Sequence, residues 1–183
     1  MLLGSTVQAN TITLGYVSTT PGLGGTFDWT YSVSFANSVL NTGDFFTIND
    51  FGVVNSFTTT LFPGFAESQA LIGTNVPGLL ATLPYTDNPS ILNVTFTWGG
   101  VDGLVVPNSS FTLTLNSNIG LPATVDAYNS SDHSFNPAGQ VSHATGFLLG
   151  PNAAPDGGSA VTLLGIALAG LEGARRLIRA RKS

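Results

Sequence analysis

Hydrophobic and polar residues alternate along most of the chain between residues 10 and 150. The clearest run is 27–35, in which Phe, Trp, Tyr and Val occupy every second position and Asp, Thr and Ser lie between them. A two-residue period places the apolar side chains on one face of a strand and the polar side chains on the other. The same alternation predicts strands with one buried face at 11–17, 92–98 and 111–115.

Shorter apolar runs predict further strands at 45–51, 56–62, 66–72, 103–106, 124–128 and 140–149. Turn-forming pairs such as Pro21-Gly22, Pro63-Gly64 and Asn136-Pro137 separate these runs. Residues 70–80 are the one helix-like window, and Pro77 interrupts it. About eight to ten short strands with turns between them predict an all-β domain over residues 10–150, an antiparallel β-sandwich of jelly-roll-like type.

Charge is divided unequally along the chain. All five basic residues lie within the last nine positions, namely Arg175, Arg176, Arg179, Arg181 and Lys182. A soluble segment of the preceding length ordinarily carries about twenty Lys and Arg. Up to Ala154 the chain has eight acidic residues and a formal charge of −8. Such a surface repels phosphate backbones, which excludes nucleic-acid binding. The absence of Cys excludes a thiol nucleophile and Cys-based metal sites.

An apolar stretch precedes the basic cluster. Residues 157–174 contain a single charged side chain, Glu172, at the spacing that pairs with Arg175 and Arg176 on a helix. We predict a single transmembrane helix at 160–174, at the short end of the range for a membrane span. The basic tail at 175–183 then stays in the cytoplasm, as the positive-inside rule expects. The alternative is an amphipathic helix packed on the domain, although the stretch has no polar stripe of helical period.

Two shorter segments suggest processing. Val7 and Ala9 are small residues at the −3 and −1 positions of a signal-peptidase site, so we interpret residues 1–9 as the remnant of a truncated signal peptide. The alternative is a short first strand or an unstructured end. The sequence at 121–125 begins like a sortase site but lacks the Gly that should follow, and we interpret it as a loop that enters a strand.

The C-terminal region resembles a PEP-CTERM sorting signal, and more narrowly its Val-Pro-Asp-Ser/Gly-Gly variant. The resemblance rests on a short motif, an apolar helix and a terminal Arg cluster in that order. The motif residues are Pro155, Asp156, Gly157, Gly158 and Ser159. Ala154 stands where the family usually has Val, and Glu172 interrupts the helix. Segments 41–54, 91–100 and 127–146 also loosely resemble exported PEP-CTERM proteins, which adds no chemistry.

The resemblance implies a route of export. Residues 151–159 would be a linker that carries the sorting motif, and the helix would be a transient anchor in the inner membrane. An exosortase, a membrane protease-transpeptidase, would cleave the chain near the motif. The domain would then pass to the cell surface or to an extracellular matrix of exopolysaccharide, as in a biofilm.

Catalytic patterns are weak in this sequence. The two histidines are His133, expected in a solvated turn, and His143, expected to be partly buried on a strand. No Gly-x-Ser-x-Gly motif occurs. We therefore expect no enzyme activity. A secreted glycoside hydrolase is the alternative, and it would need two carboxylates that face each other across a cleft.

Two kinds of binding site are candidates. Calcium could bind at acidic loops, with Asp44, Asp50, Asp126 and Asp132 as ligands, unless these loops are simply solvated. No other cofactor is expected. Glycans could stack on Tyr85, Trp98 and Tyr128, although Trp98 also fits a core position. The leading hypothesis is a structural or adhesive matrix protein, and the second is a carbohydrate-binding module displayed by the same route.

Overall fold

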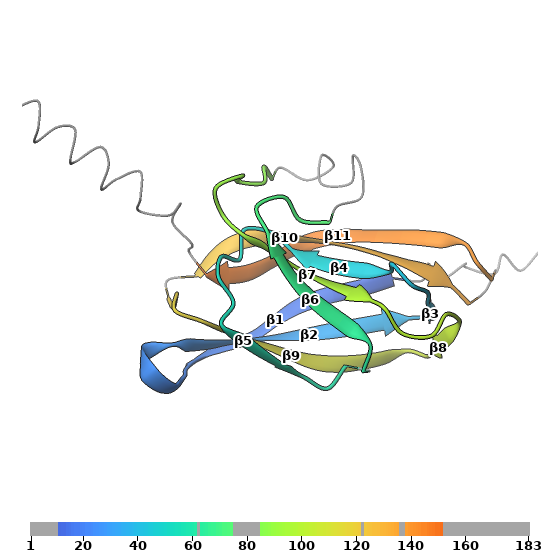
Figure 1. The fold of residues 1–183 in the computed structure, drawn as a ribbon, viewed down its shortest axis with the longest axis horizontal. Helices are drawn as coiled ribbons and strands as arrows, with labels where there is room; N and C mark the ends of the chain where they lie inside the picture. Colours follow the sequence, from blue (N-terminus) through green and yellow to red (C-terminus); the bar gives the residue numbers. More distant parts are fainter. Residues whose placement is uncertain (1–10, 62, 75–84, 122, 136–137, 152–183) are drawn as a thin grey trace, which may run out of the picture. The chain divides into compact units, whose positions relative to one another are not determined.

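The computed structural model describes residues 11–61, 63–74, 85–121, 123–135 and 138–151. The chain divides into two compact units, Met1–Ala153 and Ala154–Ser183, and the described residues belong to the first. Two antiparallel sheets pack face to face in this unit, which confirms the predicted all-β sandwich (Figure 1). The signal-peptide remnant, the sorting motif, the predicted transmembrane helix and the basic tail lie outside the described residues. Within the described ranges no helix has the length and hydrophobicity needed to cross a membrane.

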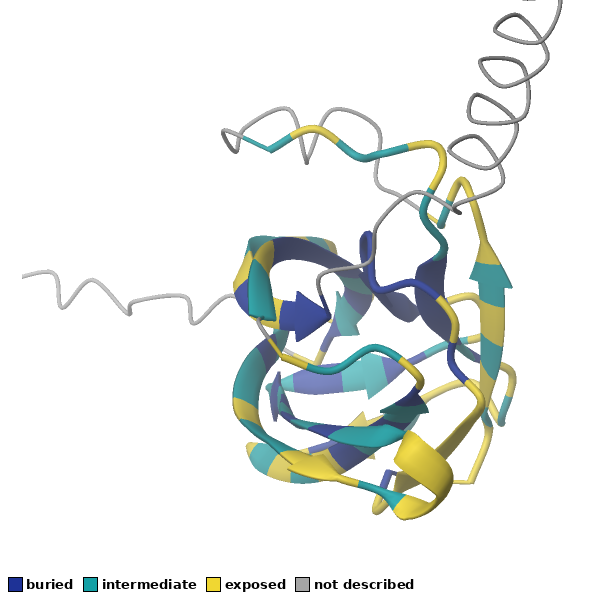
Figure 2. Ribbon diagram, turned by 90° about the vertical axis from the view of Figure 1, so that its left-hand side faces the viewer, coloured by how far each residue is buried: buried dark blue, intermediate teal, exposed yellow. Residues whose placement is uncertain are grey.

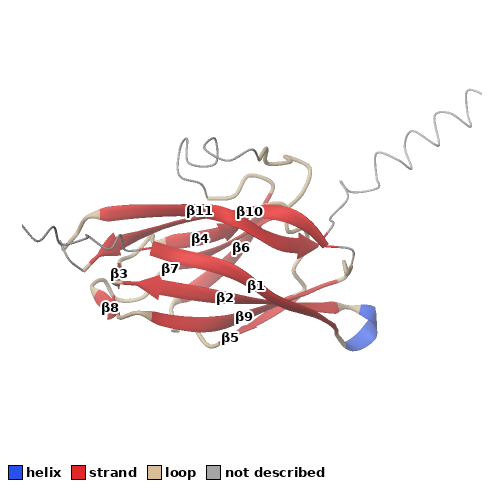
Figure 3. Ribbon diagram, turned by 180° about the vertical axis from the view of Figure 1, so that it is seen from behind, coloured by secondary structure: helices blue, strands red, loops and turns tan. Residues whose placement is uncertain are grey.

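The smaller sheet contains three of the four strands that clear alternation predicted, at 11–17, 27–35 and 111–115. Its order is β1 (Thr11–Pro21), β2 (Phe27–Ala36), β9 (Ser109–Ser117) and β5 (Ser56–Thr59). β1 and β2 form a long hairpin whose turn contains the 3-10 segment η1 (Leu23–Gly25), drawn as the blue helix in Figure 3. The apolar positions of β2 face inward and the Ser and Thr positions face outward, as expected from the sequence.

The larger sheet is built around β10 (Ala123–Ser134). On one edge β10 pairs with β11 (Val141–Pro151), and on the other with β4 (Phe45–Ile48) and β3 (Ser38–Leu40). β4 pairs with β7 (Asn93–Trp98), which also pairs with β6 (Phe65–Ala70), and β3 pairs with β8 (Leu104–Val106). β3 with β4, and β7 with β8, are therefore two long strands, each interrupted by a loop.

The core lies between the two sheets, and Figure 2 colours the buried parts of the ribbon dark blue. Many of the core side chains are aromatic. Phe46 and Phe96 stack with ring centroids 5.1 Å apart, and Phe51 meets Trp29 and Tyr31 edge-on. Aromatic pairs of this kind stabilise a fold by about 0.5–1.5 kcal/mol each beyond the burial of their area. Because these rings come from both sheets, the core fixes how the two sheets face each other.

The prediction for 124–128 was too short. β10 continues to Ser134 and includes the segment that the sequence suggested was a turn around His133. Its polar residues Asn129, Ser130 and Asp132 are buried, so the strand lacks the apolar–polar alternation that would have revealed it. The three-residue strand β3 was not predicted at all, because it is too short to show a period.

The expected inward face of β11 was also wrong. The sequence placed His143 in phase with Val141 and Phe147 on a partly buried face. In the structure Val141 is 49% exposed, Phe147 is 45% exposed, and His143 is exposed as well. The buried side chain near the end of the strand is Leu148, on the opposite face.

Candidate functional site

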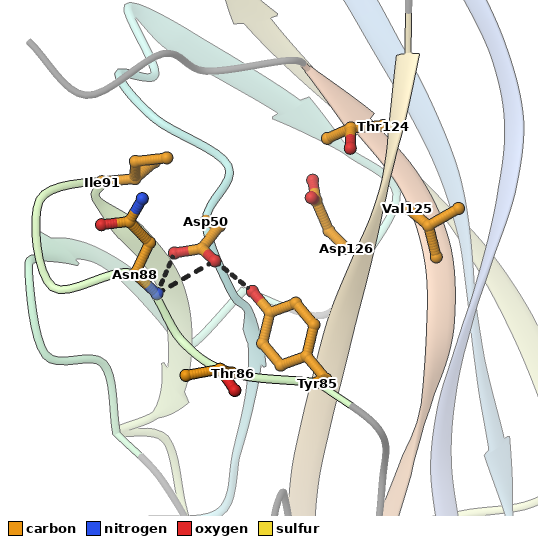
Figure 4. A pocket seen from close by; sticks show the side chains of 8 residues that line it. All are labelled: Asp50, Tyr85, Thr86, Asn88, Ile91, Thr124, Val125 and Asp126. Carbon is orange, nitrogen blue, oxygen red and sulfur yellow. Dashed lines mark hydrogen bonds between the residues drawn. The ribbon is translucent and has the colours of Figure 1, made fainter.

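Three segments that are distant in the sequence form a polar pocket of about 250 Å³ at one end of β10 (Figure 4). They are the loop after β4, the segment 85–91 before β7, and the first residues of β10. The lining residues are Asp50, Tyr85, Thr86, Asn88, Ile91, Thr124, Val125 and Asp126. Two of the four acids proposed from the sequence, Asp50 and Asp126, face this one pocket.

The loop after β4 holds Asp50 in an unusual backbone conformation. Its φ angle is +54°, a left-handed value that Asp tolerates better than most residues. The Asp50 amide donates a hydrogen bond to Asn93 Oδ1 at 2.6 Å, and Asn93 Nδ2 donates to Asp87 Oδ1 at 3.1 Å. Asn93, the first residue of β7, thereby ties the Asp50 loop to the segment 85–91.

The Asp50 carboxylate accepts hydrogen bonds from the facing segment. The Tyr85 hydroxyl donates to Oδ2 at 2.5 Å, and the Asn88 amide lies 3.0 Å from Oδ1 and 3.1 Å from Oδ2. Burial raises the pKa of Asp50, whereas these donors act in the opposite direction. Burial, and then the bond to Asp50, raise the pKa of Tyr85, so the phenol stays protonated and donates.

Asp126 lies on the opposite side of the pocket, on β10 (Figure 4). The residue is 2% exposed, and its Oδ2 atom has no hydrogen-bond partner in the described structure. Burial, and then the nearby Asp50, raise the pKa of Asp126 to about 8. Gly150 on β11 packs against this carboxyl, because a Cβ at residue 150 would overlap Asp126 Oδ2. The unpaired Oδ2 atom thus lies against Gly150 of β11, on a residue that also lines the pocket.

The other two acids, Asp44 and Asp132, lie at the far end of β10. Ser38 Oγ donates to Asp132 Oδ2 at 2.5 Å, and His133 Nδ1 lies 2.8 Å from Asp44 Oδ1. Burial raises the pKa of Asp132 to about 7, against the effect of the Ser38 bond, and burial also raises the pKa of Asp44. His133 is thus not the solvated turn residue expected from the sequence, but the partner of a buried carboxyl.

The structure divides the four calcium candidates into two separate pairs. In the part of the chain that the structure describes, no group of three or more His, Asp and Glu side chains is arranged to hold a metal. Any cation here would therefore need neutral oxygen ligands as well as carboxylates.

The three aromatic candidates for glycan stacking also separate. Trp98 is 3% exposed, and its ring packs against Gly64 and Gly100, where any Cβ would overlap it. Tyr128 is 7% exposed, and its ring lies against Gly146 in the same way. Neither ring presents a face to solvent. The structure therefore places Trp98 and Tyr128 in the core, and the prediction that glycans stack on them was wrong. Tyr85 alone lies at a pocket.

Comparison with known proteins identifies the C-terminal region. A family model described as the VPDSG-CTERM motif matches residues 155–178. The motif is a PEP-CTERM-type exosortase sorting signal, so the chain carries the signal of an exported, exosortase-processed protein of the cell surface. A search of curated proteins found no match to the chain.

Proposed function

We propose that this protein is a structural or adhesive component of an exopolysaccharide matrix, delivered and cleaved by an exosortase. One observation carries the proposal: the sorting motif begins at residue 155, directly after the all-β domain whose last strand ends at Pro151. We infer the role of the domain at the cell surface from the sorting motif that follows it.

The physical steps of export follow from the C-terminal segment. The apolar residues 160–174 act as a transient anchor in the inner membrane, and the basic residues 175–183 remain in the cytoplasm. Pro155 lacks a backbone donor and Gly157-Gly158 disfavours regular structure, which are sequence features that suit a segment that a protease must reach. Removal of the anchor and tail then releases the −8 domain.

A non-catalytic role fits the buried acids. In glycosidases the environments of the two carboxyl groups push their pKa values apart, which leaves one acid and one carboxylate. Here the Asp50 carboxylate already accepts hydrogen bonds from Tyr85 and Asn88 within the protein, and Asp126 is 2% exposed. Among the described residues around His133, Ser38 Oγ donates to Asp132 while His133 pairs with Asp44, which is not the arrangement of a serine-hydrolase triad.

Glycan binding is the second candidate function, and one observation favours it. Tyr85 places a phenol beside the Asp50 carboxylate at the pocket, a combination of ring and acceptor that suits sugar hydroxyl groups. A glycan array tests this function: saturable binding that is lost in Tyr85→Ala supports it. Failure of the wild-type protein to bind any glycan leaves the structural role.

The test of export uses the full chain with an N-terminal epitope tag in cells with and without exosortase. We expect the C-terminal piece to be removed only when exosortase is present. Pro155→Ala and Asp156→Ala should leave the protein in the membrane fraction, whereas the control Asn152→Ala, upstream of the motif, should be processed normally. Identical fractionation of wild type and motif variants would contradict the proposal.

The jelly-roll interpretation of the fold is part of this proposal. The chain passes repeatedly from one sheet to the other, from β2 to β3 and β4, then to β5, to β6 and β7, and to β9 and β10. Repeated crossing between two antiparallel sheets is the connectivity on which jelly rolls are built.

A further inference from the structure

We propose that the pocket between Asp50 and Asp126 binds a calcium ion. The inference rests on the β-domain alone and holds whether or not an exosortase processes the chain. It combines three observations: buried acids without Lys or Arg partners, an unpaired carboxylate oxygen on a buried residue that lines the pocket, and a lining that supplies several oxygen ligands.

The first observation concerns charge balance. Asp44, Asp50, Asp126 and Asp132 are all buried. Buried carboxylates are normally compensated by Arg or Lys, because an unpaired charge in a low-dielectric interior is costly. The sequence offers neither residue before Arg175. Compensation must therefore come from protons, from His, or from an ion that the protein does not itself provide.

The two acid pairs differ in this respect. His133 contacts Asp44 and lies next to Asp132, so that pair has a side chain able to become cationic. The pocket that contains Asp50 and Asp126 is lined by neither histidine. Among the described residues, the Asp50–Asp126 pair therefore has no cationic side chain beside it, and its negative charge could be compensated by a bound cation.

The second observation is geometric. Asp126 Oδ2 lacks a hydrogen-bond partner in the described structure although the residue is almost fully buried and lines the pocket. Across the pocket, Asp50 Oδ1 accepts a hydrogen bond from the backbone amide of Asn88 and keeps acceptor capacity. Figure 4 shows the two carboxyl groups facing the same space from β10 and from the loop after β4.

The third observation is the ligand chemistry. Besides the two carboxyl groups, the lining supplies oxygens from Tyr85, Asn88 and Thr124, and it contains no sulfur or imidazole. Hard cations prefer such a set, and calcium accepts six to eight oxygens in irregular geometry, whereas magnesium demands a near-octahedral one. A volume of about 250 Å³ leaves room for an ion that keeps several waters.

Two carboxylates make a weak site. Calcium affinity depends on the number of charged ligands, and extracellular modules with few of them bind with a Kd of about 10⁻⁴–10⁻³ M.

The experiment titrates CaCl₂ into the full chain, purified in mild detergent and stripped of metal with EDTA. Isothermal titration calorimetry at pH 8 should give one site per chain in the Kd range above. Differential scanning fluorimetry should show a rise in Tm of about 3–6 °C at ten times the Kd. MgCl₂ at equal concentration should give a smaller shift.

Variants make the test specific. Asp126→Asn should lose the calcium response, and Asp50→Asn should do the same if Asp126→Asn fails to fold. Asp132→Asn is the matched control, because it removes a buried acid from the same strand about 20 Å away, and it should respond like wild type. The proposal is overturned by a wild-type protein that does not respond to calcium at about 10 mM. It is equally overturned by a response that survives in the Asp126 and Asp50 variants, or that magnesium reproduces in full.

Discussion

The buried carboxyl of Asp126 should make the stability of this domain fall as the pH rises through neutrality. Its pKa is about 8 in the folded protein, against 3.8 for an unperturbed Asp. Between these two values the folded state holds a proton that the unfolded state has lost. Stability is therefore greatest below the unfolded value, declines up to the folded value, and is level above it.

The magnitude follows from linkage. One proton difference changes the free energy of unfolding by about 1.4 kcal/mol per pH unit, so Asp126 removes about 4 kcal/mol between pH 5 and pH 8. Asp132, with a pKa of about 7, acts in the same direction between pH 5 and pH 7 and removes about 2 kcal/mol more. These losses are a large share of the roughly 5–15 kcal/mol by which domains are stable.

The assay is urea unfolding in EDTA at pH 5, 6, 7 and 8, followed by the fluorescence of the buried Trp29 and Trp98. Asp126→Asn removes the titrating group, so the variant should be destabilised less than wild type as the pH rises. Between pH 5 and pH 8 its free energy of unfolding should fall by about 4 kcal/mol less than that of wild type. In Asp132→Asn the change of slope should be confined to the range below pH 7. Parallel profiles for wild type and Asp126→Asn would refute the reasoning.

Three further predictions concern packing around the same strand, each measured by urea unfolding at pH 6. Gly150→Ala should destabilise the protein by about 1–3 kcal/mol, because the added Cβ would overlap the Asp126 carboxyl. The loss should be smaller in an Asp126→Ala background, and equal losses in both backgrounds would contradict this contact. Trp98→Ala should cost about 3–5 kcal/mol, since the ring is buried in the core, and a loss below 1 kcal/mol would argue against its core position. His133→Ala should cost about 1–3 kcal/mol by removing the partner of the buried Asp44, whereas His143→Ala on the exposed face should be near neutral.

The strands that sequence analysis identified most clearly include those with one face exposed to solvent. In β2, Trp29 and Tyr31 alternate with Thr30 and Ser32, and this contrast is visible in the sequence because only one side of the smaller sheet is buried. β10 lacks the contrast, since its interior positions include Asn129 and other polar residues. Hydropathy alone cannot reveal a strand whose polar side chains are buried.

The sequence identified residues that line the pocket, but not which of them lie together in the fold. Asp50 and Asp126 could be named from the sequence as calcium candidates, together with Asp44 and Asp132. Which acids share a pocket depends on the register of β4 against β10, which pairs Ile48 with Tyr128, and no local pattern encodes that register. One signal was available: Asp126 lies between Val125 and Ala127 in an apolar run, in a segment that has no basic residue to offset it.

The attachment of the sorting region to β11 has a mechanical consequence. The ladder between β10 and β11 extends without interruption from Ala123–Pro151 to His133–Val141, and residue 152 follows at once. When the chain beyond that residue is held, any pull on the domain enters through this last strand. Antiparallel hydrogen bonds run perpendicular to the strands, so tension along β11 loads the whole ladder in shear, whereas tension across it opens the bonds singly from Pro151. The force that the domain can withstand would then depend on the direction in which β11 is pulled.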